Sequence, residues 1–163
     1  MATVPQTPPP MTAEEFARRP DPGHPEELVE GRVVAMAPPG ARHGVICGRI
    51  VRLLGNFVEE RDLGHYVAND AGVVTQRAPD SVRGPDVAFY SYDRLPRGPL
   101  PEGYPGVPPD FVFEVMSPSD RWPAVLAKVA EYLAAGVGGV AVIDPARRTA
   151  HLYEGDEPVR VLG

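Results

Sequence analysis

The chain has 163 residues, of which 43% are hydrophobic and 23% are charged; this is the composition of a folded globular protein and excludes a disordered chain. We expect one compact domain over residues 11–163, preceded by a flexible Pro-rich tail at residues 1–10. The net charge of −6 argues against a protein that coats nucleic acid nonspecifically, because such binding depends on Lys and Arg contacts to phosphate.

The first predicted elements are a short helix and a pair of strands. Thr12 and Glu15 have the spacing of a capping box, and Pro20 ends the helix that they begin. Residues 27–36 then predict two short strands joined at Glu30–Gly31.

A long helix is predicted from His43 to a residue before Gly64. Apolar residues recur there at three- and four-residue steps, which is typical of one buried helix face: Val45, Ile46, Ile50, Leu53, Leu54, Phe57 and Val58. Arg42, Arg49 and Arg52 are expected around the other side of this helix.

The rest of the chain predicts strands and one further helix. The strands are expected over residues 65–70, 72–76, 85–90, 110–116, 139–144 and 149–154. A helix running to about Ala135 should bury Trp122, Val125, Leu126, Val129 and Leu133, and the unit 110–144 should be a right-handed parallel crossover. The pattern favours an α/β or α+β fold with a mixed central sheet flanked by helices. The Pro/Gly-rich loop over residues 91–109 has a length at which loops are often functional.

Cysteine and histidine usage narrows the chemistry. The single Cys47 excludes an internal disulfide and a thiolate zinc finger. The four histidines show no metal-ligand spacing, so a zinc site has no support from their positions. The chain has no uncharged run of about 18 residues and no signal-peptide pattern at its N-terminus, so we expect a cytoplasmic protein with no membrane partner.

Glu114 is the most informative single residue. It lies between Phe113 and Val115 in a strand that should be covered on both faces. A carboxylate there is costly to desolvate unless it is paired, protonated or bound to a metal ion. An ion pair with Arg or Lys explains Glu114 about as well as a metal does.

Asp86 is the second acidic candidate. It follows Pro85, and because Pro-Asp is also a common turn sequence, a plain strand-start residue is the alternative. Adjacent strands could bring Asp86 and Glu114 together, and two facing carboxylates favour a cation between them. Hard oxygen ligands of this kind suit Mg²⁺ or Mn²⁺.

Lys128 is the candidate cation. On its predicted helix it shares a side with Val125 and Tyr132. It is either a solvated surface lysine or a cation that reaches back to the carboxylates, where it would polarise a phosphate or orient an attacking water. The chain has no GxxxxGK[ST] phosphate loop and no GxSxG motif, so the ATPase and serine-hydrolase classes have no support.

Pro85–Asp86 followed by Glu114 on an apolar strand resembles the PD-(D/E)XK nuclease superfamily, in which these acids bind the catalytic metal. The chain more closely resembles the Uma-two family of putative restriction endonucleases, over about residues 11–155. The matching stretches are ELVEGRVVAMAPPGARHG, PDVAF, FEVMSPSDR, KVAEYLAAGV and VIDP.

The resemblance also assigns the remaining site candidates. The superfamily pattern has a lysine two residues after the second acid, where this chain has Met116, and the resemblance implies that Lys128 takes its place from the following helix. Glu27 and His43 match a glutamate and a histidine of the family and are second-tier candidates. A hairpin salt bridge and a helix-start histidine are the alternatives for these two residues.

The resemblance implies an endonuclease that hydrolyses DNA phosphodiester bonds, with Mg²⁺ or Mn²⁺ held by Asp86 and Glu114. DNA would lie against Arg42, Arg49 and Arg52, and a homodimer would place two sites on opposite strands. The alternative is a non-catalytic binding or assembly module with a nuclease fold. The acidic balance, the displaced lysine and the glycine-rich segment Val137–Ala141 favour that alternative.

Overall fold

The structure is a computed structural model that describes residues 8–163. Residues 1–7 of the predicted tail lie outside the described residues. Residues 8–10, the rest of the predicted tail, lie beside the turn between the first two strands. The Arg32 guanidinium donates to the carbonyl of Pro8 at 3.0 Å, and Met11, which follows the tail, donates its backbone N–H to the carbonyl of Gly31 at 2.9 Å.

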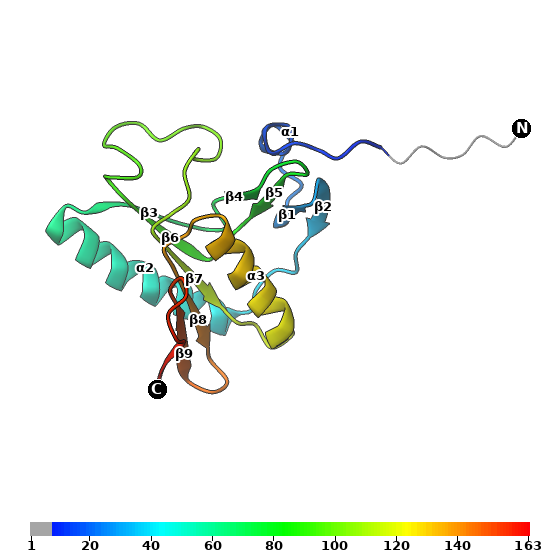
Figure 1. The fold of residues 1–163 in the computed structure, drawn as a ribbon. Coiled ribbons are helices and arrows are strands. Elements are labelled where there is room, and N and C mark those ends of the chain that lie inside the picture. The colour runs from blue at the N-terminus through cyan, green and yellow to red at the C-terminus, as the bar shows by residue number, and fades with distance from the viewer. Residues whose placement is uncertain (1–7) are drawn as a thin grey trace, which may run out of the picture.

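The order of helices and strands agrees with the sequence pattern (Figure 1). The helices are α1 (Ala13–Ala17), α2 (Ala41–Arg61) and α3 (Trp122–Ala134). The strands are β1 (Glu26–Val29), β2 (Arg32–Ala35), β3 (Gly64–Ala68), β4 (Val73–Gln76), β5 (Ser81–Arg83), β6 (Val87–Ser91), β7 (Phe111–Val115), β8 (Gly139–Asp144), β9 (Thr149–Tyr153) and β10 (Arg160–Leu162). The capping box of Thr12 and Glu15 is present, and β5 and β10 are strands that the sequence pattern did not predict.

The strands form two sheets where the sequence predicted one. The larger sheet has the order β10-β9-β8-β7-β6-β3 and is mixed, because β7 and β8 are parallel and its other neighbours are antiparallel. The smaller sheet has the order β2-β1-β5-β4 and is antiparallel. The mixed α+β fold and the parallel β7–α3–β8 crossover are confirmed.

Side-chain alternation along the larger sheet decides where Glu114 points. Val112 of β7, Val140 of β8 and Tyr132 of α3 belong to one buried core. Because alternate residues of a strand face the same side, Glu114 lies on the Val112 face, toward α3. A carboxylate is therefore placed at the margin of the main hydrophobic core.

Helix α2 covers the other face of this sheet. Tyr66 of β3 pairs with Phe89 of β6, which faces away from α3, and the Tyr66 ring packs on Gly55 of α2. A Cβ at position 55 would lie 2.9 Å from that ring, so only glycine allows this close approach. This packing fixes the C-terminal half of α2 against β3, and at the other end of the helix His43 lies 3.2 Å from Asp86, just before β6.

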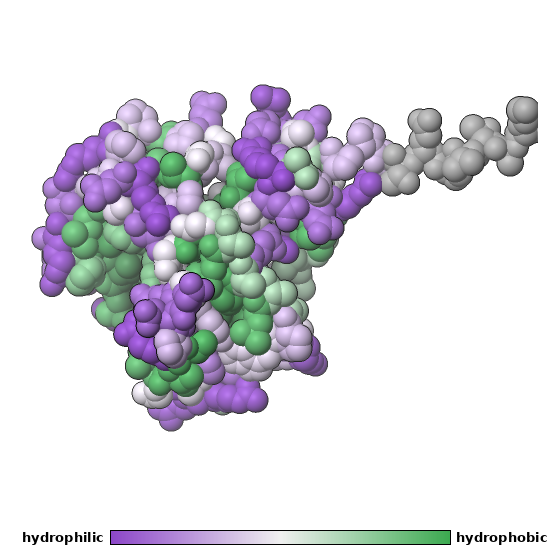
Figure 2. Space-filling view, in the orientation of Figure 1, coloured by the Kyte–Doolittle hydropathy of each residue, from purple (hydrophilic) through white to green (hydrophobic). Residues whose placement is uncertain are grey.

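The predicted apolar face of α2 is wrong in part. Val45, Leu53 and Phe57 are 55%, 61% and 50% exposed, so the helix carries apolar residues on its outer surface as well as its inner one. Figure 2 shows this apolar surface, in green, over α2. The reason is that the apolar positions span more than half of the helix circumference, whereas the sheet covers only one side.

The inner face of α3 also differs from the prediction. Leu126 is 43% exposed, whereas Tyr132 is fully buried and packs in the core. No helix within residues 8–163 combines the length and apolarity needed to span a membrane.

Candidate active site

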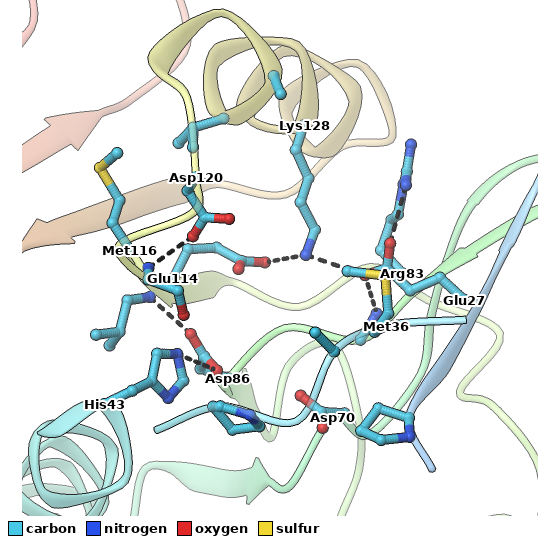
Figure 3. Close-up of a pocket in the computed structure, with 18 of the residues that line it drawn as sticks. Glu27, Met36, His43, Asp70, Arg83, Asp86, Glu114, Met116, Asp120 and Lys128 are labelled. Carbon is cyan, nitrogen blue, oxygen red and sulfur yellow. Dashed lines mark hydrogen bonds and ion pairs between the residues drawn. The ribbon is translucent and has the colours of Figure 1, made fainter. Parts of the chain in front are cut away.

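A cleft of about 540 Å³ opens where the two sheets, the start of α2 and the first turns of α3 meet. Five of the residues singled out from the sequence line it: Glu27, His43, Asp86, Glu114 and Lys128. They come from β1, α2, the start of β6, β7 and α3, and Figure 3 shows their side chains converging in the cleft. The fold therefore brings together residues that lie as much as 101 positions apart in the chain.

Asp86 is held at both carboxylate oxygens. The backbone N–H of Val115 donates to its Oδ2 at 2.6 Å, and Nε2 of His43 lies 3.2 Å from its Oδ1. The β6–β7 pairing ends at Val87 and Phe113, so the Asp86 side chain extends the hydrogen bonding between these strands by one step. This contact fixes the carboxylate beside the last residues of β7.

Glu114 lies on the neighbouring strand, opposite Asp86 in the antiparallel register. Its Oε1 accepts a hydrogen bond from the Tyr132 hydroxyl at 2.8 Å and lies 2.9 Å from Nζ of Lys128. Burial raises the pKa of Glu114, the charge of Lys128 opposes this, and the negative charge of Asp86 adds to the rise. The ion pair that the sequence left open as an explanation of Glu114 is thus present.

Lys128 bridges two carboxylates. Its Nζ lies 2.9 Å from Glu114 and 3.0 Å from Oε1 of Glu27, and its side chain is 21% exposed. Burial lowers the pKa of Lys128, but the two carboxylates outweigh burial and raise it above its ordinary value. The ammonium is therefore charged and aimed into the cleft from α3.

The composition of the chain also singles out Lys128. Of the 16 basic residues in the chain, 15 are Arg and Lys128 is the only lysine. An ammonium is a compact point charge that fits between two carboxylates, whereas a guanidinium is a wide planar fork. A chain that otherwise uses Arg throughout has its single lysine at the point where a compact charge is needed.

Glu27 anchors Lys128 from the smaller sheet. It is 5% exposed, accepts from the Arg83 guanidinium at 2.9 Å and accepts from the backbone N–H of Gly84 at 3.1 Å. Burial raises the pKa of Glu27, but the charge of Lys128 and the Arg83 hydrogen bond outweigh burial and lower it below its ordinary value. The alternative of a salt bridge within its own hairpin is wrong, because both partners belong to β5 and α3.

His43 and Cys47 occupy one face of the first turns of α2, at i and i+4. Sγ of Cys47 lies 3.4 Å from Nδ1 of His43, and one ligand atom from each of His43, Cys47 and Asp86 lies within 4.8 Å of the others. Burial, with the nearby charge of Asp86, raises the pKa of the Cys47 thiol to about 12. The sequence interpretation compared the histidines only with one another, and so it missed the His43–Cys47 spacing.

The three arginines predicted to bind DNA lie outside the cleft lining. Arg42, Arg49 and Arg52 are all exposed on α2. Arg42 donates to the carbonyl of Pro145 at 2.5 Å, whereas Arg49 and Arg52 form no ion pair with any residue of 8–163.

Sequence reasoning missed several residues that shape the site. Arg83 lies on the unpredicted β5 and links Glu27 to Glu131, to which its Nη2 donates at 2.6 Å. Asp70 lines the cleft from the turn between β3 and β4, and desolvation and the charge of Asp86 raise its pKa. The segment Asn69–Gly72 has only the signature of a turn, so nothing in it marked Asp70 as part of the site.

The donor set fits a divalent metal ion with hard ligands. Asp86 and Glu114 supply carboxylates from adjacent strands, and within residues 8–163 no hydrogen bond reaches Oε2 of Glu114. Mg²⁺ takes one or two protein carboxylates and keeps several waters, and the cleft has room for those waters.

Comparison with known proteins identifies the family of the chain and a solved structure of similar fold. A family described as "Putative restriction endonuclease", Uma2, matches residues 13–163. The fold is similar to that of a solved structure from Anabaena variabilis ATCC 29413, described as a putative nuclease belonging to DUF820. That similarity has a TM-score of 0.76 at 22% identity and covers 94% of this chain and 84% of the other. No match is found among curated proteins. Because the family match spans nearly the whole chain, this protein belongs to the Uma2 family of putative restriction endonucleases.

Proposed function

We propose that the protein is a Mg²⁺- or Mn²⁺-dependent endonuclease that hydrolyses phosphodiester bonds of DNA. The observation that carries the proposal is the arrangement of Asp86, Glu114 and Lys128: two carboxylates from adjacent strands and one half-buried ammonium 2.9 Å from the second of them. The nuclease family supports the same reaction class.

Asp86, Glu114 and Lys128 would each have a distinct role. Asp86 and Glu114 would hold the divalent ion, which when bound lowers the pKa of a water molecule and neutralises charge on the leaving oxygen. Lys128 binds a nonbridging oxygen of the phosphate and stabilises the negative charge that develops there. Glu27 and Arg83 keep the Lys128 side chain extended into the cleft through the contacts at 3.0 and 2.9 Å.

Lys128 could bind a phosphate without leaving its present partners. Its ammonium contacts Glu114 and Glu27, and an ammonium carries three N–H donors, so one donor remains for a phosphate oxygen. A metal ion held by Glu114 would also draw charge from that carboxylate and weaken its hold on Lys128.

The DNA surface and the assembly are part of the proposal. Arg49 and Arg52 of α2, with Arg42 nearer the cleft, would contact the DNA backbone, since all three are exposed and the chain carries a net charge of −6 that only a local basic surface could offset. A homodimer would present two such sites to opposite strands. The cytoplasmic location expected from the sequence stays a prediction.

A second function is favoured by one observation. Lys128 already neutralises Glu114 without a metal ion, which is compatible with a structural ion pair in a non-catalytic binding module. The two functions differ in whether divalent ions change the protein and its effect on DNA.

The experiment that tests the proposal is nicking of supercoiled plasmid by purified protein with Mg²⁺, Mn²⁺ or EDTA. We expect nicking with either metal and none with EDTA. Asp86→Asn and Glu114→Gln should each reduce it by about 10²–10³-fold, whereas Asp62→Asn, at an exposed carboxylate paired with Arg97, should have no effect. Absence of nicking by the folded wild-type protein with both metals would favour the binding module.

A further inference from the structure

Three metal-ligating side chains gather at the side of the cleft next to α2. His43 and Cys47 lie one helical turn apart, and Asp86 at the start of β6 faces them. One ligand atom from each lies within 4.8 Å of the other two. The proposed endonuclease chemistry uses only Asp86 of these three and leaves the thiol and the imidazole unexplained.

We propose that His43, Cys47 and Asp86 form a binding site for Zn²⁺, next to the magnesium site and sharing Asp86 with it. The zinc site stands on its own geometry, whereas the sharing of Asp86 rests on the proposed function. Zinc bound there would act as an inhibitor, because it would take a carboxylate that the proposed reaction needs.

One ligand atom from each residue lies within 4.8 Å of the others, so the three could reach one tetrahedral ion after side-chain movements of about 1 Å. Zinc bonds of about 2.0–2.3 Å separate tetrahedral ligand atoms by roughly 3.3–3.7 Å. Nε2 of His43 already lies 3.2 Å from Oδ1 of Asp86; Sγ of Cys47 lies 3.4 Å from Nδ1 of the same ring, so the imidazole must turn to present one nitrogen to an ion shared with the thiolate. Three protein ligands leave one position for water, as in open zinc sites.

The ligand types separate the two metals. A thiolate and an imidazole are good ligands for Zn²⁺ and poor ones for Mg²⁺, which prefers carboxylates and water. Zinc binding converts the Cys47 thiol to a zinc thiolate, and its proton leaves to solvent. The side chain of His43 is 11% exposed and that of Asp86 13%, so the ion would be enclosed by protein on most sides.

Contacts within the protein hold the three ligands near one another. Asp86 is fixed by the Val115 N–H at 2.6 Å, and both α2 ligands project from the same helix. Zinc would replace the direct contact between His43 and Asp86.

The test is a titration of the full-length, metal-free protein with Co²⁺, which substitutes for zinc and gives a near-ultraviolet absorption band when a thiolate binds it. Cys47 is the only cysteine in the chain, so such a band reports this residue alone. We expect a band that saturates at one equivalent, disappears when Zn²⁺ is added, and is absent in Cys47→Ser. A wild-type protein without the band would overturn the proposal.

Two further variants test which residues bind the ion. His43→Gln should weaken cobalt binding by more than the roughly 10–100-fold that loss of an outer-shell partner costs. His24→Gln is the matched control, because that histidine lies at the surface beside Glu26 and should change nothing. Cobalt binding of unchanged affinity in His43→Gln would refute the proposed site. So would a band that saturates at half an equivalent of cobalt, which would mean that two chains share one ion.

Plasmid nicking separates this inference from the proposed function. One equivalent of Zn²⁺ should suppress Mg²⁺-dependent nicking by the wild-type protein, and Cys47→Ser should need at least tenfold more zinc for the same fractional loss. A cobalt band without any nicking would leave the zinc site standing and refute the endonuclease. Nicking without a cobalt band would do the reverse.

Discussion

Replacing Lys128 by Met tests the residue on which the proposed chemistry most depends. The change keeps a stem of similar length and removes the only positive charge that contacts Glu114 directly among residues 8–163. It also removes one of the two cations at Glu27, which keeps Arg83. Two carboxylates with side chains only 6% and 15% exposed are then left short of positive charge.

The expected loss of stability follows from this burial. Removing one partner of a buried ion pair costs about 3–5 kcal/mol. Because Lys128 is 21% exposed, solvent screens part of the interaction, and we expect about 3 kcal/mol. For a domain of this size that corresponds to a fall in Tm of about 6–12 °C. Mg²⁺ should stabilise the variant more than the wild type, because the ion replaces positive charge beside Glu114.

The assay combines thermal unfolding with plasmid nicking. Nicking by Lys128→Met should fall by about 10²–10³-fold at a temperature where the variant is folded. Lys128→Arg should lose less stability than Lys128→Met because it keeps the charge, yet nick at least about tenfold more slowly, since a planar fork does not reach the same point.

The control is Arg97→Met, which breaks an exposed ion pair with Asp62 and should leave the Tm close to that of the wild type, because solvent screens such a pair. If Lys128→Met melts and nicks like the wild type, Lys128 is an ordinary surface lysine, and the proposed mechanism loses its cation.

Three other outcomes are expected. Mg²⁺ at a hundredfold excess over its Kd should stabilise the wild type by about 2.7 kcal/mol, and calorimetry should show no such gain in Asp86→Ala or Glu114→Ala. Arg49→Glu with Arg52→Glu should weaken DNA binding and reduce the slope of log affinity against log salt by about 2; an unchanged slope in a titration at several salt concentrations would place DNA elsewhere. Because the folded pKa of Glu27 lies below its ordinary value, Glu27 adds stability above its unfolded pKa and loses it as pH falls through the folded value. Glu27→Gln should therefore flatten the acid limb of the Tm–pH curve, and a slope equal to that of the wild type would contradict the assigned ion pairs.

Much of the fold could be predicted because short-range sequence patterns determine those elements. The capping box at Thr12, the apolar run of β7 and the parallel β7–α3–β8 unit each have a short-range signature that tertiary contacts did not override. The three-residue strand β5 has no such signature. It forms because Leu28 of β1 and Val74 of β4 both pair with Val82, and those contacts are set by the second sheet rather than by local sequence.

The site residues also differ in whether the local sequence could identify them. Glu114 could be singled out because a charge in an apolar strand needs a partner, and Lys128 because the resemblance pointed to its helix. Which partner Glu114 takes depends on where α3 crosses the sheet, and no local pattern sets that crossing. From the sequence, Cys47 only excluded a zinc finger. Its closeness to Asp86 could not be predicted, because it arises from the packing of α2 on β6.

The central claim is that the cleft binds a divalent ion through Asp86 and Glu114. Crystals soaked in Mn²⁺ and measured at the manganese absorption edge test it directly, because the anomalous signal locates the ion independently of activity. We expect an anomalous peak within bonding distance of carboxylate oxygens of both residues, with Lys128 shifted from Glu114 toward Glu27. A map with no peak at this place, at a Mn²⁺ concentration that supports plasmid nicking, would contradict the account.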